Sequence, residues 1–183
     1  MDAAASFLYY RVTMTEKLQI QNEYTPEITE KGFAVCRGWS QAMVQELIER
    51  SQEAPILHFT PNDAARRFKT LESTEAWLSD ESRTVYTLDD GQTAGMIWYT
   101  ETPREDLDAR YTFGIRMYER TRGKKLAEGF MRAVHADFAE IAHSPRVWLE
   151  TGTDNAAALH LYAKFGYQEV DRTDERVTMV YGK

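Results

Sequence analysis

Two groups of residues have types and spacings that could do chemistry. The first, Arg122-Gly123-Lys124-Lys125, joins closely spaced cations to the start of a long apolar helical pattern. A helix start binds anions such as phosphate through its free amides and its dipole. In the second group, Asn155 stands at the start of another helical pattern, and Tyr162 lies two turns further along the same face. We therefore expect an anion site and one wall of a cleft.

Each of these features also has a purely structural interpretation. The basic segment would be a solvated turn that binds nothing, Asn155 a helix N-cap, and Tyr162 a half-buried core residue. The segment is neither a Walker loop nor a dinucleotide fingerprint, because GxxxxGK[ST] and GxGxxG are both absent from the sequence. If a phosphate binds there, it belongs to a different ligand.

The elements that must position these residues alternate only in part between strands and helices. Strand patterns are found at 17–21, 32–39, 83–101 (a hairpin around Asp90-Gly91), 110–118, 146–151, 167–170 and 176–182. Helical patterns are found after Ser40, in short pieces between 55 and 80, at 123–142, and at 155–165, where Gly166 ends the helix. Because hairpins require antiparallel pairing, we predict an α/β (α+β) fold whose central mixed, mostly antiparallel sheet is flanked by helices.

Composition limits the class of partner. We expect residues 1–183 to form a single domain, with 1–31 as a weakly patterned N-terminal extension. The formal net charge is −7, so a long polyanion would be repelled and no nucleic-acid partner is expected. An acidic surface, including the loop 102–109, suits a small cationic partner, although acidity that serves only solubility is the alternative.

Cysteine usage and hydropathy give expectations about location. The single cysteine, Cys36, forms no internal disulfide, and the sequence holds no Cys/His cluster of the kind that binds zinc. We expect no metal and a reducing, cytoplasmic environment. Asp2 stands where a signal peptide has positive charge, and no apolar run is long enough to span a membrane. The alternatives of Met1 and Met14 as the native start stay open.

Read in order, the two groups resemble the GNAT superfamily of acyl-CoA-dependent N-acyltransferases. The pattern N-x-x-A-x-x-L-Y-x-K-x-G-Y is matched over residues 155–167, and the loop pattern Q/R-x-x-G-x-G/A falls on residues 122–127. The resemblance covers about the C-terminal half, from the hairpin at Asp90-Gly91 onward. It implies a coenzyme A thioester in a cleft between splayed central strands.

The resemblance also implies a role for each matched position. The amides from Gly123 to Glu128 would hold the coenzyme pyrophosphate, the backbone of Ile115 and Met117 would contact the pantetheine arm, and Asn155 would touch the same arm. The residues implied in coenzyme binding are Ile115, Met117, Arg122, Gly123, Lys124, Lys125, Leu126, Ala127, Glu128 and Asn155.

Lys125 departs from the family pattern, since it replaces the central glycine of the loop. If the loop continues directly into the helix, we expect position 125 to keep ordinary helical dihedrals, so that a side chain costs little.

For catalysis, the resemblance implies Tyr162 as the general acid for the departing thiolate and Glu150 as the general base. Glu150 is a reasonable base only if burial raises its pKa, and Glu101 is the rival on physical grounds. We predict an N-acetyltransferase that uses acetyl-CoA, with direct attack of a primary amine on the thioester.

Several alternatives stay open at this point. A non-catalytic module that binds or senses acyl-CoA would keep the fold, and a partner-binding domain would leave the basic turn empty. Another acyl-CoA, a water molecule as base, and a homodimer are also open. The acceptor amine is unidentified among polyamines, aminoglycosides, amino acids and protein amines.

Overall fold

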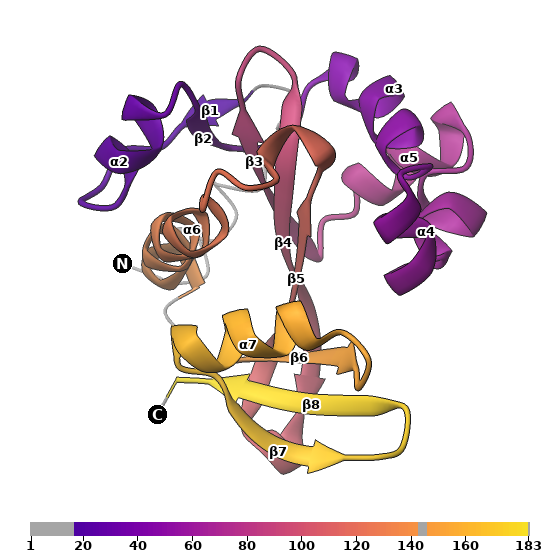
Figure 1. Cartoon of the computed structure of the whole chain (residues 1–183), viewed down its shortest axis with the longest axis vertical. Helices are drawn as coiled ribbons and strands as arrows, with labels where there is room; N and C mark the ends of the chain where they lie inside the picture. Colours follow the sequence, from indigo (N-terminus) through magenta and orange to yellow (C-terminus); the bar gives the residue numbers. More distant parts are fainter. Residues whose placement is uncertain (1–16, 143–145, 183) are drawn as a thin grey trace, which may run out of the picture.

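A single eight-stranded sheet runs through the molecule (Figure 1). The computed structural model describes residues 17–142 and 146–182. The strands lie in the order β1-β2-β3-β4-β5-β6-β8-β7. Their bounds are β1 Leu18–Gln19, β2 Ala34–Arg37, β3 Arg83–Asp89, β4 Thr93–Arg104, β5 Ala109–Met117, β6 Val147–Gly152, β7 Gln168–Arg172 and β8 Arg176–Tyr181. The β5–β6 pair is parallel and every other neighbouring pair is antiparallel, so the predicted mixed, mostly antiparallel sheet is confirmed.

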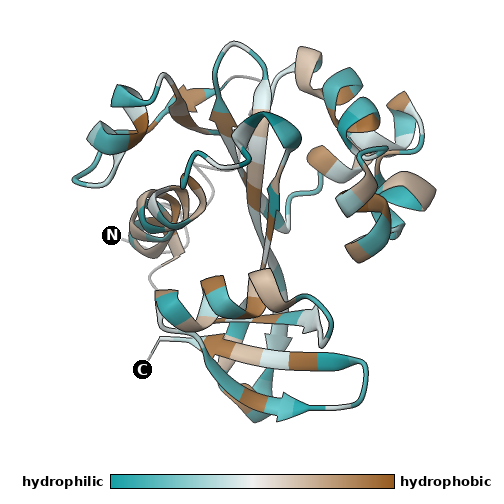
Figure 2. Cartoon of the chain, in the orientation of Figure 1, coloured by the Kyte–Doolittle hydropathy of each residue, from teal (hydrophilic) through white to brown (hydrophobic). Residues whose placement is uncertain are grey.

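Helices cover both faces of the sheet. Their bounds are α2 Thr25–Glu30, α3 Gln41–Arg50, α4 Ala54–Phe59, α5 Leu71–Leu78, α6 Ala127–Ala142 and α7 Ala156–Phe165, with a π-helical turn at Asp63–Arg67. One apolar cluster joins α2, α6 and α7 to the sheet, and a second joins α3, α4 and α5 to the opposite face. Each helix carries both hydrophilic and hydrophobic residues (Figure 2), as expected for amphipathic helices packed on a sheet.

The central strands β5 and β6 separate soon after they meet. Only Tyr111–Val147 and Thr112–Trp148 are in register between them, whereas β5 pairs with β4 as far as Met117. The part of β5 after Thr112 therefore has a free edge toward β6. This is the predicted splay of the central strands, and it opens a gap between them.

Three local predictions differ from the structure. Residues 25–30, predicted as part of a weakly patterned extension, form helix α2, whose Ile28 is buried. β4 continues to Arg104 through a bulge after Glu101, although 102–109 was predicted to be a loop. Helix α6 begins at Ala127 and not near Gly123, because Gly123 and Lys125 both have positive φ angles that an α-helix cannot accommodate.

The predicted end of the helix at Gly166 is confirmed. Cys36 is a buried core residue, His135 is a buried packing residue, and Gly166 ends α7 in the left-handed conformation. Within the described residues, none of the helices has the length and apolar character of a membrane span. In the same residues no group of three or more His, Cys, Asp or Glu side chains is arranged to hold a metal ion.

Candidate active site

The free edge of β5 presents backbone groups to the gap. Tyr118 N donates to Ala94 O of β4 at 3.1 Å, and main-chain groups alternate in direction along a strand. The amides and carbonyls of Phe113, Ile115 and Met117 therefore point away from β4, toward the gap. The structure thus places Ile115 and Met117 where an extended ligand could pair with the strand edge.

The loop before α6 lies beyond the end of this free edge. Within the described residues, no hydrogen bond is formed by the amides of Gly123, Leu126, Ala127 and Glu128, nor by that of Lys125. The amide of Lys124 differs, because it donates to Thr121 O at 3.2 Å. Several free amides thus precede a 16-residue helix. Their N–H groups and the positive end of the helix dipole together favour the binding of an anion.

Lys125 contradicts our expectation of ordinary helical dihedrals. Its φ is +53° and that of Gly123 is +73°, so both residues are in the left-handed region that favours glycine. The loop does not run directly into the helix. Its backbone reverses at these two positions, and Lys125 is left-handed at the position where the family pattern has its central glycine.

The four cations of the loop have different environments. Arg120 donates to both carboxylate oxygens of Asp90, at 2.8 and 2.9 Å, and Arg122 lies 3.8 Å from a carboxylate oxygen of Glu53. The ammonium of Lys124 lies over the ring of Phe33, 4.8 Å from its centroid. For Lys125, by contrast, no hydrogen bond or ion pair is found within the described residues, and the side chain is exposed.

Two carboxylates outside the loop hold it in place, and sequence reasoning did not identify them. Asp90 belongs to the β3–β4 turn, and the charge and hydrogen bonds of Arg120 lower its pKa although burial alone would raise it. Glu53, which precedes α4, accepts a hydrogen bond from Glu119 N at 2.8 Å. Arg120 therefore joins the loop to the hairpin, and the free amides are held in a defined position.

Tyr162 lies beside the point where the strands separate. Its ring centroid is 6.1 Å from that of Phe113, the first residue of the free edge. Burial raises the pKa of its hydroxyl to about 12, and the nearby charge of Arg116 opposes this shift. The phenol is therefore protonated at neutral pH and can act as a proton donor.

Asn155 is the N-cap of α7, since its side-chain oxygen accepts a hydrogen bond from Ala158 N at 3.3 Å. This confirms the structural interpretation of Asn155. The side-chain amide nitrogen of Asn155 donates no hydrogen bond within the described residues. This nitrogen is therefore available to donate to a ligand in the gap.

The two acidic candidates are placed differently. Glu150 is exposed on β6, with Thr178 Oγ1 3.5 Å from its carboxylate, so the burial that we required for a base is absent. Glu101 forms an ion pair with Arg110 at 2.6 Å. It is in register with Tyr111, before the strands separate.

A cluster of charged and aromatic residues lies on the other face of the sheet. Arg116 of β5 forms an ion pair with Asp63 at 2.6 Å, and Arg67 contacts the same carboxylate at 2.9 Å. Both guanidinium groups lie over the ring of Trp98, at 4.8 Å for Arg116 and 5.9 Å for Arg67. The sequence patterns did not indicate this cluster, because its members are far apart in the chain. Asp63 and Arg116 are separated by 53 positions.

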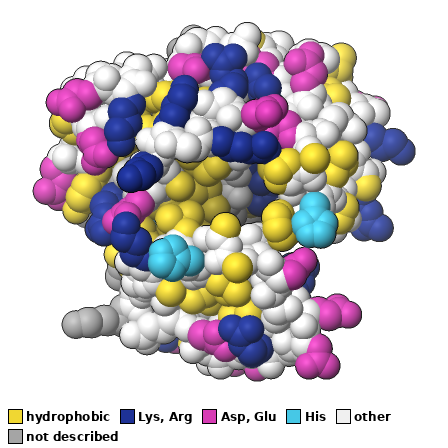
Figure 3. Space-filling view, in the orientation of Figure 1, with side chains coloured by type: hydrophobic (Ala, Val, Ile, Leu, Met, Phe, Trp, Pro, Cys, Tyr) yellow, Lys and Arg dark blue, Asp and Glu magenta, His cyan; other side chains and the backbone are white. Residues whose placement is uncertain are grey.

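A space-filling view shows a hollow across the middle of the molecule (Figure 3). Hydrophobic side chains form its floor, and Lys and Arg side chains lie along its upper rim. In the same orientation, the loop before α6 lies above the hollow and α7 lies below it (Figure 1). The hollow therefore combines an apolar floor with positive charge, in a chain whose formal net charge is −7.

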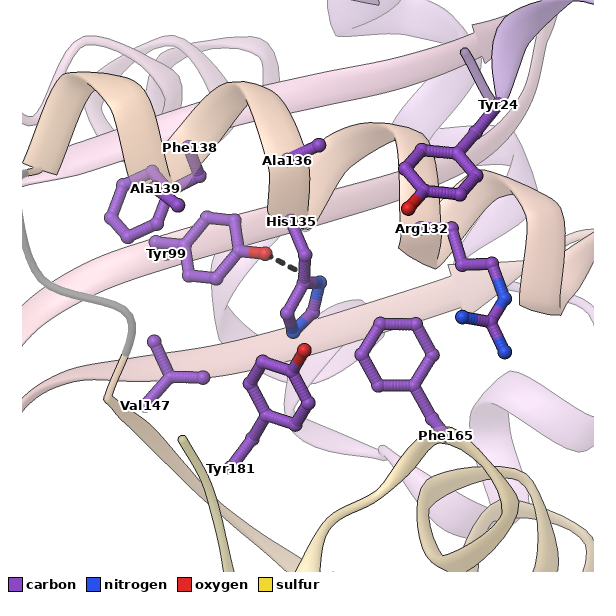
Figure 4. Close-up of a pocket in the computed structure, with 10 residues that line it drawn as sticks. All are labelled: Tyr24, Tyr99, Arg132, His135, Ala136, Phe138, Ala139, Val147, Phe165 and Tyr181. Carbon is purple, nitrogen blue, oxygen red and sulfur yellow. Dashed lines mark hydrogen bonds between the residues drawn. The ribbon is translucent and has the colours of Figure 1, made fainter. Parts of the chain in front are cut away.

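A separate pocket of about 190 Å³ lies between α6, α7 and the end of β8 (Figure 4). None of the predicted site residues lines it. Its wall includes His135, whose Nδ1 is 2.8 Å from the hydroxyl of Tyr99 and whose Nε2 is 2.9 Å from that of Tyr167. Burial lowers the pKa of His135 to about 3, so the ring is neutral at physiological pH. We interpret this network as part of the core.

The comparison with family models gives the class of the protein. Residues 57–167, more than half of the chain, match the model described as "Acetyltransferase (GNAT) family". The chain belongs to this family, and as a member it is an acyl-CoA-dependent N-acetyltransferase. A comparison with curated protein sequences finds no match.

Solved structures of low sequence identity share the fold. Spermidine N-acetyltransferase from Vibrio cholerae, in complex with CoA and spermine, is similar with a TM-score of 0.66 and 14% identity, covering 82% of this chain and 95% of that one. Ribosomal-protein-S5-alanine acetyltransferase from Vibrio fischeri has a TM-score of 0.63 and 14% identity, covering 89% and 95%. A GNAT-family acetyltransferase from Streptococcus pneumoniae has a TM-score of 0.62 and 19% identity, covering 90% and 98%.

Proposed function

We propose that this protein transfers an acetyl group from acetyl-CoA to a primary amine of a small molecule or protein, by direct attack of the amine on the thioester. The observation that carries the proposal is that three features meet along one gap. These are the free edge of β5, the free amides before α6, and the protonated phenol of Tyr162 beside Phe113.

The residues present fit coenzyme A. Its pyrophosphate would be held by the amides of Gly123 and of residues 125–128, and Lys125 would add charge close to it. Its pantetheine arm would extend along Phe113, Ile115 and Met117 as an additional strand, since their amides and carbonyls face the gap. The Asn155 side-chain amide would contact the same arm. Acetyl-CoA supplies the activated acyl group as a co-substrate.

Proton transfer is the part of the reaction that side chains must provide. The amine nitrogen forms a bond to the thioester carbonyl carbon while the carbon–sulfur bond breaks. The thiolate takes a proton from Tyr162, and the nitrogen, which begins as an ammonium, releases two protons in all. The first proton leaves to solvent before the attack, because an ammonium has no lone pair, and the second is returned to Tyr162 after the carbon–nitrogen bond has formed. Because Glu150 is exposed and lacks the burial that a base would need, we propose that its carboxylate holds the ammonium by charge and that water takes the first proton.

Two measurements test the proposal. Calorimetric titration with coenzyme A should show binding, and thiol release from acetyl-CoA should depend on an added primary amine. We would measure thiol release across a panel of polyamines, amino acids, aminoglycosides and peptides. Absence of coenzyme binding at millimolar concentration would overturn the whole proposal. Binding without thiol release for any amine would instead support a module that senses acyl-CoA.

We make two further proposals, on location and on assembly. The single cysteine supports a reducing, cytoplasmic environment. One solved structure of the Vibrio cholerae spermidine N-acetyltransferase is described as dodecameric, and for this chain we propose a homodimer. Light scattering of the purified protein would test this assembly, and a monomeric mass would reject it.

A further inference from the structure

The two faces of the sheet beside the gap carry different side chains. Thr112 and Trp148 are in register, and side chains alternate between faces along each strand. Trp148 and Glu150 of β6 therefore share a face with Gly114 and Arg116 of β5. Tyr162 packs on Phe113, which belongs to the opposite face. An amine that approaches from the face of Glu150 would thus meet the thioester from the side away from α7.

On this face, the two arginines Arg67 and Arg116 pair with a single carboxylate. Within the described residues, the ion pairs of Arg67 and Arg116 all go to Asp63, whose side chain is 1% exposed. Two guanidinium groups therefore share one buried carboxylate. The side chain of Arg67 is 39% exposed, and its Nε and Nη2 form no hydrogen bond within the described residues. These donors are available to a ligand.

Arg116 brings part of this charge to the gap itself. Its Nη1 donates to Ile115 O at 2.9 Å, and that carbonyl points toward the gap because it lies on the free edge of β5. A carbonyl oxygen has two lone pairs, so the contact leaves room for a second donor. The charge of Arg116 also opposes the rise that burial causes in the pKa of Tyr162, which packs on the other face of β5. The guanidinium is therefore close to the place where the acyl group would be transferred.

Helix α4 contacts the turn before α7. His58 of α4 lies 3.6 Å from Asp154, and both side chains are exposed, at 65% and 66%. The contact connects the layer of α3–α5 with the turn that precedes α7.

We propose that the acceptor is a small amine that also carries a carboxylate, with free α-amino acids as the simplest class. The inference rests on the proposed acetyltransferase function and specifies its substrate. The carboxylate would bind the free Nε and Nη2 of Arg67, since a guanidinium group binds a carboxylate in a planar geometry, and the ammonium would face Glu150 on β6. Arg116 would add positive charge, because its own nitrogens already donate to Asp63 and to Ile115 O. A polyamine has only positive charges, and the guanidinium charge would repel it.

The test uses matched acceptors that differ only in the carboxylate. Thiol release from acetyl-CoA is measured with amino acids, with the corresponding amino acid amides, and with spermidine. We expect kcat/KM to be at least about tenfold higher for the acids than for the amides, which is the discrimination that one charge-assisted hydrogen bond provides. Spermidine should be a poor acceptor.

The variant Arg67→Gln tests the assigned residues, because it leaves the buried Asp63–Arg116 pair intact. It should raise KM for the amino acids about tenfold or more and leave the KM for the amides unchanged. Arg66→Gln is the matched control, since Arg66 is exposed on the same turn, and it should change neither value. Equal use of acids and amides, or an unchanged KM in Arg67→Gln, would overturn the inference.

A direct binding measurement separates this inference from the proposed function. The protein saturated with coenzyme A is titrated calorimetrically with an amino acid and with its amide. Binding of the acid alone, lost in Arg67→Gln, supports the carboxylate site even if no acceptor gives turnover. If neither compound binds and no amine releases thiol, both proposals fail. Turnover of amines that lack a carboxylate would retain the acetyltransferase and reject the acceptor class.

Discussion

The indole of Trp98 lies against the backbone of Gly114 on the neighbouring strand. The two residues are in register between β4 and β5, and a β-carbon on Gly114 would overlap with Cζ2 of the indole and lie 2.8 Å from Cη2. The absence of a side chain at Gly114 lets the ring extend from β4 across β5. Trp98 then supports the guanidinium groups of Arg67 and Arg116 at the gap.

Gly114→Ala should therefore displace the indole. We expect a loss of about 1–3 kcal/mol in the free energy of unfolding, which is typical of overpacking, and a higher KM for the acceptor. The dissociation constant of coenzyme A should change less, because the backbone groups of Gly114 point to β4. Chemical denaturation and steady-state kinetics measure both effects. Gly129→Ala is the control, since its β-carbon would meet Ile28 at an ordinary 3.6 Å. Equal stability changes in the two variants would contradict this role of Gly114.

Two substitutions at Lys125 separate the effect of backbone strain from the effect of the side-chain charge. Lys125→Gly should raise the free energy of unfolding by up to about 1 kcal/mol, because a residue with a side chain is strained at φ +53°. Lys125→Ala keeps that strain and removes the charge. Both should weaken coenzyme A binding about two- to fivefold at low salt and less at high salt. Titrations at two salt concentrations provide the measurement. Unchanged affinity in both variants would show that the ammonium does not contact the coenzyme.

Tyr162→Phe tests the proposed acid. Removal of a general acid should lower kcat by about 10²- to 10⁴-fold, while the dissociation constant of coenzyme A stays within about twofold, because the pyrophosphate site is distant in the fold. Rapid measurement of thiol release and calorimetry give the two values. As a control, Tyr181→Phe removes a hydroxyl from the pocket shown in Figure 4, and kcat should be unaffected. Turnover equal to that of the wild type in Tyr162→Phe would remove the role as acid.

His135 should make the protein sensitive to acid. Burial lowers its pKa from 6.5 to about 3, so the unfolded chain takes up a proton below pH 6.5 while the folded chain does not. Stability is therefore complete above pH 6.5 and falls as the pH decreases toward 3, by about 1.4 kcal/mol per pH unit from this residue. Urea denaturation at several pH values measures the slope.

Two variants separate this effect from other titrations. His135→Gln should reduce the slope between pH 6 and 4, although the variant is less stable at neutral pH because contacts with Tyr99 and Tyr167 are altered. His160→Gln, at an exposed position of α7, should keep the slope of the wild type. The same slope in all three proteins would show that other groups control the acid response.

Much of the site could be predicted from local sequence patterns. The helix that begins after Asn155, with Tyr162 two turns further on, is specified by residues close together in the chain, and the hairpin at Asp90-Gly91 is specified by its turn residues. The start of α6 was predicted wrongly, because the helical pattern was taken back to Gly123 and the loop was expected to run directly into the helix, whereas Gly123 and Lys125 have positive φ angles. The structure holds this loop through Asp90, which is 30 residues away from its partner Arg120.

The sequence by itself determined the family pattern, the order of most elements, and the candidates Asn155 and Tyr162, because local spacing and turn chemistry are encoded by neighbouring residues. Only the tertiary structure decided where β5 and β6 separate, the left-handed conformation of Lys125, and the meeting of Asp63, Trp98 and Arg116 on one face. These depend on contacts between residues far apart in the chain, in which strand register and side-chain burial outweigh local preference. The acceptor chemistry that we infer is set by those long-range contacts.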